Sequence, residues 1–130
     1  MSTLSEIGDY LEVEGVANLF LGSMPDTPDD VVVVYQYPGG PPEYIQESFT
    51  PSREKPRIQV VARATRYEDA DKAATEVWSI LASITNQVLG STKYLSIRPD
   101  DSPAIMGRDT NDRLKVYFNA AVDKEVSLVS

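Results

Sequence analysis

Residues 57–84 read RIQVVARATRYEDADKAATEVWSILASI, and the spacing of their apolar side chains changes part-way along. Over residues 57–65 apolar and polar residues alternate, which predicts a strand with one buried face and one largely polar face. The change of period after residue 65 predicts that this strand leads directly into a helix over residues 68–84. The apolar residues of that helix fall on one stripe, formed by Ala70, Ala73, Ala74, Val77, Ile80, Leu81 and Ile84.

The flanking segments complete the predicted order of elements. Thr3-Leu4-Ser5-Glu6 has the form of a capping box, in which a hydroxyl and a carboxylate satisfy free amides at a helix start. A first helix should therefore begin there and end near Gly15. Further strands are predicted at residues 31–37, 94–98 and 113–122, where β-branched and aromatic residues concentrate or alternate with polar ones.

Proline and glycine separate these elements. The segments SMPDTPDD (residues 23–30), PGGPP (38–42) and RPDDSP (98–103) are predicted loops or turns. The order helix, strands, helix, strands predicts an α+β fold: an antiparallel or mixed sheet of about four to five strands, with an N-terminal helix and one long helix packed on one face. A chain of 130 residues has the usual size of one domain, so we expect a single domain over residues 1–130. Residues 123–130 could form a flexible tail.

The composition removes many kinds of active site. The chain has no cysteine and no histidine, which excludes thiolate nucleophiles, the usual zinc and iron ligands and a Ser-His-Asp arrangement. The loop PGGPP lacks the lysine and hydroxyl that a Walker-type phosphate loop requires. We therefore expect no cofactor.

The net charge also limits the possible partners. A charge of −8 at pH 7 produces a field that repels polyanions, so a protein that reads nucleic-acid sequence is not expected. Such a field still allows DNA to pass by. The longest uncharged apolar run, residues 31–35, is far shorter than the roughly 20 residues that a membrane-spanning helix needs. With no basic and apolar leader recognised at the N-terminus, we expect a soluble protein without a membrane partner.

Clusters of acidic residues are the first candidates for a metal site. Carboxylates are the ligands that Mg²⁺ and Ca²⁺ prefer, but the spacing of the first cluster fits no standard calcium loop. The alternative is that these carboxylates are solvated in loops. The second cluster would be the site of a small metal-dependent hydrolase, a rival function from a different class. The clusters are Asp26, Asp29 and Asp30, and Asp100, Asp101, Asp109 and Asp112.

Basic residues are concentrated around the strand at residues 57–65. Alternation places Arg57 and Arg63 on the same face of that strand. This face could be solvated, or it could contact an acidic patch on a neighbouring copy, because arginine is favoured at interfaces. The concentrated residues are Arg53, Lys55, Arg57, Arg63 and Arg66.

A second group of charges lies between two apolar runs. Residues 104–119, AIMGRDTNDRLKVYFN, contain Arg108, Asp109, Asp112 and Arg113 within six positions. The alternation from Leu114 onward predicts a hairpin that joins a short strand to the long last one. Its turn would use the ability of asparagine to adopt a left-handed conformation.

Three blocks of the sequence resemble the minor capsid or tail terminator proteins of long-tailed bacteriophages. They are LFLGSMPDTPDDVVVVYQYPGGPP, IQVVARATRYEDADKAATEVWSIL and IMGRDTNDRLKVYFNA, which together cover most of residues 18–122. The third block carries a G-R-D motif at Gly107 to Asp109, followed by Arg113. The family often has an Asn-Gly turn before that second arginine, whereas this chain has Asn111-Asp112, which leaves the turn type open.

The resemblance implies a structural virion protein, not an enzyme. Such a protein would form a hexameric ring of its own copies, end the polymerisation of the tail tube protein, and present a surface to the head-tail connector or adaptor. It would lie at the head-proximal end of the tail after assembly in the host cytoplasm, with DNA only as the passing genome. Another head-tail joining or tail completion protein of similar fold is the alternative. The candidate subunit or partner contacts are Arg63, Arg66, Arg108, Asp109 and Arg113.

Overall fold

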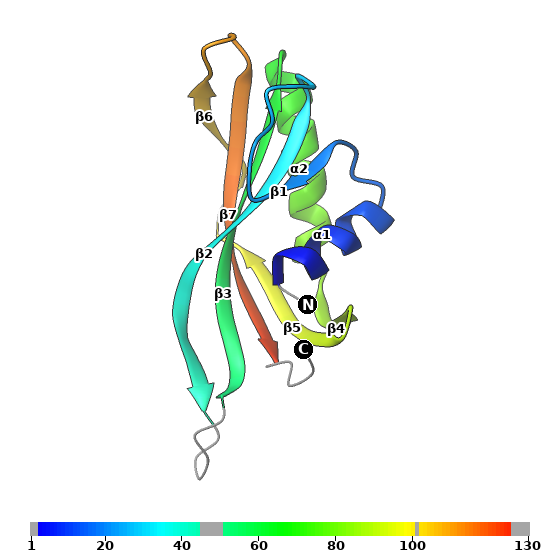
Figure 1. Cartoon of the computed structure of the whole chain (residues 1–130), viewed down its shortest axis with the longest axis vertical. Coiled ribbons are helices and arrows are strands. Elements are labelled where there is room, and N and C mark those ends of the chain that lie inside the picture. Colours follow the sequence, from blue (N-terminus) through cyan, green and yellow to red (C-terminus); the bar gives the residue numbers. More distant parts are fainter. Residues whose placement is uncertain (1–2, 45–50, 101, 126–130) are drawn as a thin grey trace.

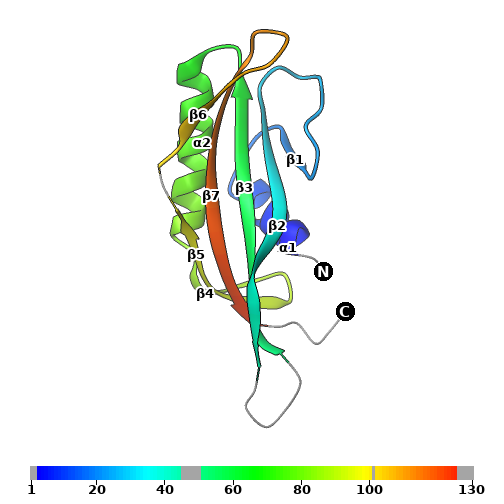
Figure 2. The same cartoon turned by 90° about the vertical axis from the view of Figure 1, so that its left-hand side faces the viewer.

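The fold is a curled sheet with two helices on one of its faces (Figures 1 and 2). The computed structural model describes residues 3–44, 51–100 and 102–125. The helices are α1 (Thr3–Val13) and α2 (Tyr67–Ala82). The strands are β1 (Leu19–Leu21), β2 (Val31–Tyr44), β3 (Pro51–Ala64), β4 (Thr85–Leu89), β5 (Thr92–Pro99), β6 (Ala104–Arg108) and β7 (Leu114–Glu125).

Strand β7 holds the sheet together. The strand order is β1-β2-β3-β7-β5-β4, and every pairing is antiparallel except that of β1 with β2. One edge of β7 pairs with β3 over nearly its whole length, while the other pairs first with β6 and then with β5. Strands β6 and β5 therefore follow one another along the same edge of β7, as Figure 2 shows.

The two helices cover different parts of the sheet. Helix α2 packs on β3, β7 and β5, whereas α1 contacts β1, β2 and β4. Because β1 and β4 are the two ends of the strand order, the sheet curls far enough for both ends to reach one helix. The core between sheet and helices includes Ile7, Leu11, Val34, Ile58, Val60, Ala74, Val77, Leu81, Val116 and Phe118.

Helix α1 is fastened to the far end of the sheet by a buried carboxylate. Glu6 is 1% exposed and accepts hydrogen bonds from the Ser91 backbone N (3.2 Å), Thr92 Oγ1 (2.9 Å) and Tyr94 Oη (2.9 Å). Burial, reinforced by the bond to Glu6, raises the pKa of the Tyr94 hydroxyl, so Tyr94 remains a donor. The predicted capping box is therefore wrong: Thr3 is already helical, and Glu6 is turned into the interior.

The α+β class is confirmed, but two parts of the predicted architecture are wrong. Among the described residues the sheet has seven strands instead of four to five. Strands β1 and β4 were not predicted because they are too short to show a clear periodicity. The longest elements are strands, not a helix. The 14 residues each of β2 and β3 extend about 46 Å, against about 24 Å for the 16 residues of α2.

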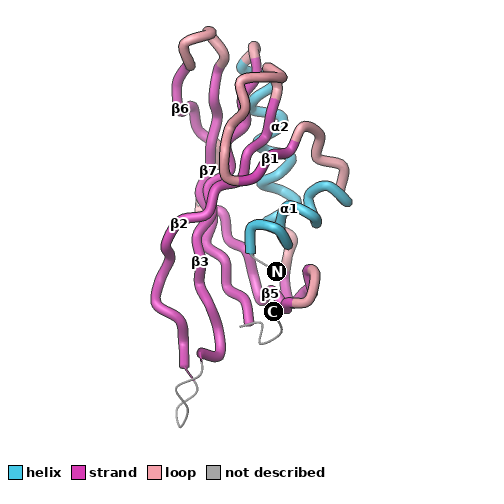
Figure 3. Tube along the Cα trace, viewed as in Figure 1, coloured by secondary structure: helices cyan, strands magenta, loops and turns pink. Residues whose placement is uncertain are grey.

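The segment PGGPP was predicted as a turn, but it lies within β2. The pairing of β2 with β3 continues past it with register shifts at Tyr37, Gly40 and Glu43. Strand β1 pairs only with Val32 to Val34, so the rest of β2 has one edge without a strand among the described residues. Proline lacks an amide donor but is tolerated on such an edge. The β2–β3 ribbon consequently extends beyond the helices (Figure 3).

The end of the chain was expected to include a flexible tail over residues 123–130. Strand β7 continues to Glu125, and residues 126–130 lie outside the described residues.

Candidate functional site

The five candidate contact residues all lie at one end of the sheet. At this end β2 begins, β3 ends, the β6–β7 hairpin turns and α2 starts, and the connecting loops gather there (Figure 3). The register pairs Arg63 with Val31 on one side and with Lys115 on the other. The topology thus brings together residues that are far apart in the sequence. We call this region the apical end.

Arg63 is a buried anchor for the loop between β1 and β2. It lies on the face of β3 away from the helices, yet it is only 4% exposed because residues 22–30 fold over it. Its guanidinium donates to the backbone oxygens of Pro28 (2.7 Å), Asp29 (3.1 Å) and Asp26 (3.3 Å). The part of the outer face that carries Arg63 is therefore covered within the chain itself.

Arg113 anchors the same loop from the hairpin side. It is 5% exposed and donates to Asp109 Oδ2 (2.8 Å), the Asp26 backbone oxygen (2.5 Å), Asp26 Oδ1 (3.2 Å) and Asp29 Oδ1 (3.3 Å). Burial alone would lower the pKa of Arg113, but the carboxylates outweigh it and raise that pKa. The guanidinium thus remains charged and holds two loops together.

Asp109 organises the turn of the hairpin. Its carboxylate accepts from the backbone N–H groups of Asn111 and Arg113, both at 2.9 Å. The bond from the Arg113 amide is the main cause that lowers the pKa of Asp109, and the Arg113 guanidinium adds to it. Asp112 N bonds to Asp109 O, and Asp112 itself takes the left-handed conformation (φ 60°). The predicted hairpin is confirmed, and its left-handed residue is Asp112 instead of the expected Asn111.

The other two candidate residues remain accessible. The Arg66 side chain is 69% exposed and pairs with Glu68 at 2.5 Å, just before α2. The Arg108 side chain is 51% exposed and donates to the Asp112 backbone oxygen at 3.0 Å. Exposed ion pairs of this kind contribute little to folding because water screens them, so both guanidinium groups can exchange these partners for others.

The acidic clusters proposed for a metal are divided among arginines. Asp100 pairs with Arg57, Asp109 with Arg113, and Asp112 with Arg108. Asp101 lies outside the described residues. Within the described ranges, no group of three or more aspartate and glutamate side chains is placed to hold a metal ion.

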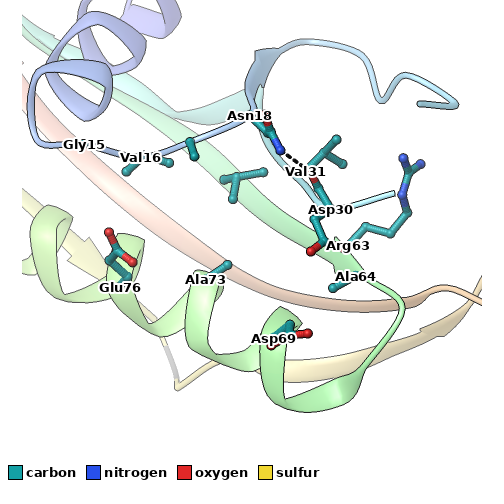
Figure 4. A pocket seen from close by; sticks show the side chains of 12 residues that line it. Gly15, Val16, Asn18, Asp30, Val31, Arg63, Ala64, Asp69, Ala73 and Glu76 are labelled. Atoms are coloured by element: carbon teal, nitrogen blue, oxygen red, sulfur yellow. Dashed lines mark hydrogen bonds between the residues drawn. The ribbon is translucent and has the colours of Figure 1, made fainter. Parts of the chain in front are cut away.

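A hollow of about 280 Å³ lies on the helix side of the apical end. Figure 4 shows it between the segment that follows α1 and the first turns of α2. Its floor is apolar and includes Val16, Val31 and Ala73. Its charged lining residues are the acids Asp30, Asp69 and Glu76 and the basic Arg63. The sequence analysis did not identify this hollow, because α2 showed only an ordinary solvated acidic face.

The opposite face of the sheet carries tyrosines, amides and basic residues. Tyr35, Tyr37, Gln59 and Asn119 line a shallow depression there. Gln59 Nε2 donates to Asn119 Oδ1 at 3.2 Å, and Arg57 donates to Tyr37 Oη at 3.3 Å. This confirms that Arg57 and Gln59 point away from the helices, as the alternation predicted.

Comparison with known protein families gives a match over nearly the whole chain. The sequence model described as "Bacteriophage tail terminator protein" matches residues 5–126. The chain belongs to the bacteriophage tail terminator family. This family consists of structural tail proteins and is not an enzyme family. The resemblance noted in the sequence is thereby confirmed, and the tail terminator family member described here is a structural component of a virion tail.

Solved structures share the fold of this tail terminator family member at low sequence identity. A chain from the structure titled "Virion of native gene transfer agent (GTA) particle" is 12% identical, with a TM-score of 0.64, and covers 97% of this chain and 100% of its own length. A second structure, of a protein without a descriptive name, is also 12% identical, with a TM-score of 0.59, and the coverages are 96% and 92%. No curated protein matches this chain.

The described part of this family member contains no helix that is long and apolar enough to span a membrane.

Proposed function

We propose that this protein is the terminator of a phage tail: a ring, hexameric as in our expectation for the family, that caps the tail tube. The single observation that carries this proposal is the family match over residues 5–126. The ring would end tube polymerisation and present its free side to the head-tail connector. Its place would be the head-proximal end of the tail, after assembly in the host cytoplasm.

The apical end supplies the residues that we propose for contacts with partners. Arg66 and Arg108 are exposed there and can pair with carboxylates of a neighbouring copy, the tail tube protein or the connector. Arg63 and Arg113 are buried, and with Asp109 they would act by holding the loop 22–30 and the hairpin in the shape that a partner contacts. In this role buried residues determine the form of a surface that they do not themselves expose.

The proposed function needs neither a catalytic group nor a cofactor. A ring around a channel is compatible with a net charge of −8, because like charge lets duplex DNA pass without adhering. DNA would be present only as the passing genome, without sequence-specific binding. The protein would act by heterologous contacts between copies, which close into a ring when the rotation between neighbours is a whole fraction of a turn.

Deletion of the gene from the phage that encodes it tests the proposal. Without a terminator, electron microscopy should show tails of irregular, extended length that are not joined to heads, and the wild-type gene on a plasmid should restore uniform joined tails. Uniform tails without joining would instead indicate another head-tail joining protein. Tails of normal length and normal joining in the deletion strain would refute a role in tail completion.

A further inference from the structure

The exposed surface of the two helices is strongly acidic. Within the described residues of α1, α2 and the turn before α2, the basic residues are Arg66 and Lys72, and Arg66 already pairs with Glu68. The acidic residues are exposed along both α1 and α2, so their charges add over one face of the molecule. We call this the acidic helix face; it consists of Asp9, Glu12, Glu14, Glu68, Asp69 and Glu76.

The opposite side of the sheet carries a group of basic residues, together with acids that lie beside arginines. Arg57 and Arg98 both pair with Ala121 of β7, one from β3 and one from β5, so all three side chains point away from the helices. Lys115 lies further along β7 on the same side. We call Arg57, Arg98 and Lys115 the basic sheet face. The acids on this side lie near arginines: Asp100 is near Arg57, Asp123 and Glu125 are near Arg53, and Asp26 and Asp29 are near Arg113.

Two features suit these faces to each other. The hollow in the acidic helix face combines an apolar floor with the carboxylates of Asp69 and Glu76, which matches the apolar stem and charged end of a lysine or arginine. The basic sheet face lies beside Tyr35, Tyr37 and Tyr117. Tyrosine and arginine are enriched at the centres of protein interfaces. Both faces therefore have the composition of contact surfaces.

We infer that the acidic helix face of one copy binds the basic sheet face of the next. This inference rests on the proposed function, in which the protein is its own partner. A contact between two different faces is heterologous, and each copy still has one free face of each sign with which to extend or close the assembly. Two acidic helix faces would repel each other, so the same charges also oppose a two-fold dimer.

Paired charge reversals test the inference. Asp69→Lys with Glu76→Lys reverses the two carboxylates of α2 that line the hollow, and Arg98→Glu with Lys115→Glu reverses two of the three charges of the basic sheet face. Each variant alone then opposes like charges at the hollow and should self-associate about 100-fold more weakly than wild type, because like charges across a contact disfavour it. An equimolar mixture restores opposite signs at every contact and should assemble with the two variants alternating.

Assembly is measured in two ways: by light scattering of the purified proteins, and by tail length when plasmids supply one or both variants to the deletion strain. The sign-preserving variants Asp69→Glu with Glu76→Asp, and Arg98→Lys with Lys115→Arg, are the matched controls and should assemble like wild type. Thermal unfolding shows that each chain is folded. All altered side chains are exposed or half-buried, so folding should persist.

The results separate this inference from the proposed function. The inference is overturned if either reversed variant alone assembles like wild type. It is also overturned if the controls assemble but the mixture assembles no better than its components in both measurements. The proposed function fails instead if the deletion strain has normal tails. Light scattering of the mixture would still decide the contact in that case, because it does not depend on what the assembly does.

Discussion

Buried charged side chains connect parts of this chain that are distant in the sequence. Glu6, Arg63 and Arg113 are each at most 5% exposed, and each bonds to a segment at least 34 residues away. An ionised group that is buried without partners costs several kcal/mol, so such groups persist only where hydrogen bonds satisfy them. Replacing one of them therefore tests a tertiary contact and not only a local one.

Replacement of Glu6 should reveal how much its carboxylate stabilises the fold. Glu6→Gln keeps the shape of the side chain but removes its charge. The new amide NH2 group then faces either Tyr94 Oη, or Thr92 Oγ1 and the Ser91 amide, and all of these groups are already donors. We expect a loss of about 2–3 kcal/mol in the free energy of unfolding, measured with urea. Glu12→Gln, on the exposed side of α1, is the control and should change it little. Equal stability of the two variants would contradict a stabilising role for the Glu6 carboxylate.

Replacement of Asp109 should change how stability depends on pH. Its pKa in the folded protein lies below the ordinary 3.8, so its stabilisation is complete well above pH 3.8 and is lost as pH falls through the folded value. Asp109→Asn should lower the urea midpoint at pH 7, and the difference from wild type should shrink below pH 3.8. Asp112→Asn is the control, since that side chain is 87% exposed and asparagine accepts a left-handed backbone. A difference that stays constant with pH would exclude the carboxylate charge as the cause.

At the scale of elements, the turn between β4 and β5 packs closely against the Glu6 carboxylate. Gly90 has φ +62°, and a Cβ added there would lie 2.7 Å from Glu6 Oε2. The carboxylate cannot move aside without loss of its own hydrogen bonds. Gly90→Ala should therefore destabilise the protein by more than the roughly 1–2 kcal/mol of the left-handed conformation alone.

Gly15 provides the matched control for this substitution. It also has a positive φ (+94°), but nothing lies within 4 Å of an added Cβ. Gly15→Ala thus has the conformational cost without the clash. The difference between the losses of stability in Gly90→Ala and Gly15→Ala gives the cost of displacing Glu6. If the two losses in a thermal unfolding experiment were equal, the contact with Glu6 would not matter.

The elements that could be predicted from the sequence are those in which buried residues recur at the regular spacing of a helix or a strand. The α2 stripe and the alternation of β7 were predicted because each has one face in the core, and Ala70, Ala74, Val77 and Leu81 are indeed buried. The prolines of residues 38–42 led to the wrong prediction of a turn. A strand tolerates them there because β1 pairs with only three residues of β2, and this pairing cannot be read from the local sequence. The burial of Arg63 likewise depends on where residues 22–30 fold. The hairpin at Asp109 was predictable because its bonds are local.

At the scale of the whole molecule, the separation of charge is invisible in the sequence. No basic residue precedes Arg53, but from there on acidic and basic residues are interspersed, and α2 and β7 show ordinary polar sides. Only the placing of both helices on one face of the sheet (Figure 2) gathers the acids there. The same arrangement leaves Arg57, Arg98 and Lys115 on the other side. The net charge of −8 is therefore distributed unevenly: the acids of the helices lack basic neighbours of equal number, whereas the acids on the other side lie beside arginines.

The separation of charge predicts that self-association depends on salt. Attraction between the acidic helix face and the basic sheet face is screened as the Debye length falls from about 10 Å at 0.1 M to about 3 Å at 1 M ionic strength. Light scattering at fixed protein concentration should show the mass falling towards the 14.3 kDa of one copy as sodium chloride is raised, from as much as six times that mass at low salt. Thermal unfolding at each salt concentration is the control for folding.

A contact made mainly by apolar groups such as Ile105 and Met106, which are 60% and 41% exposed on β6, would persist at high salt instead. Mass that rises with salt would therefore assign self-association to β6 and not to the charged faces.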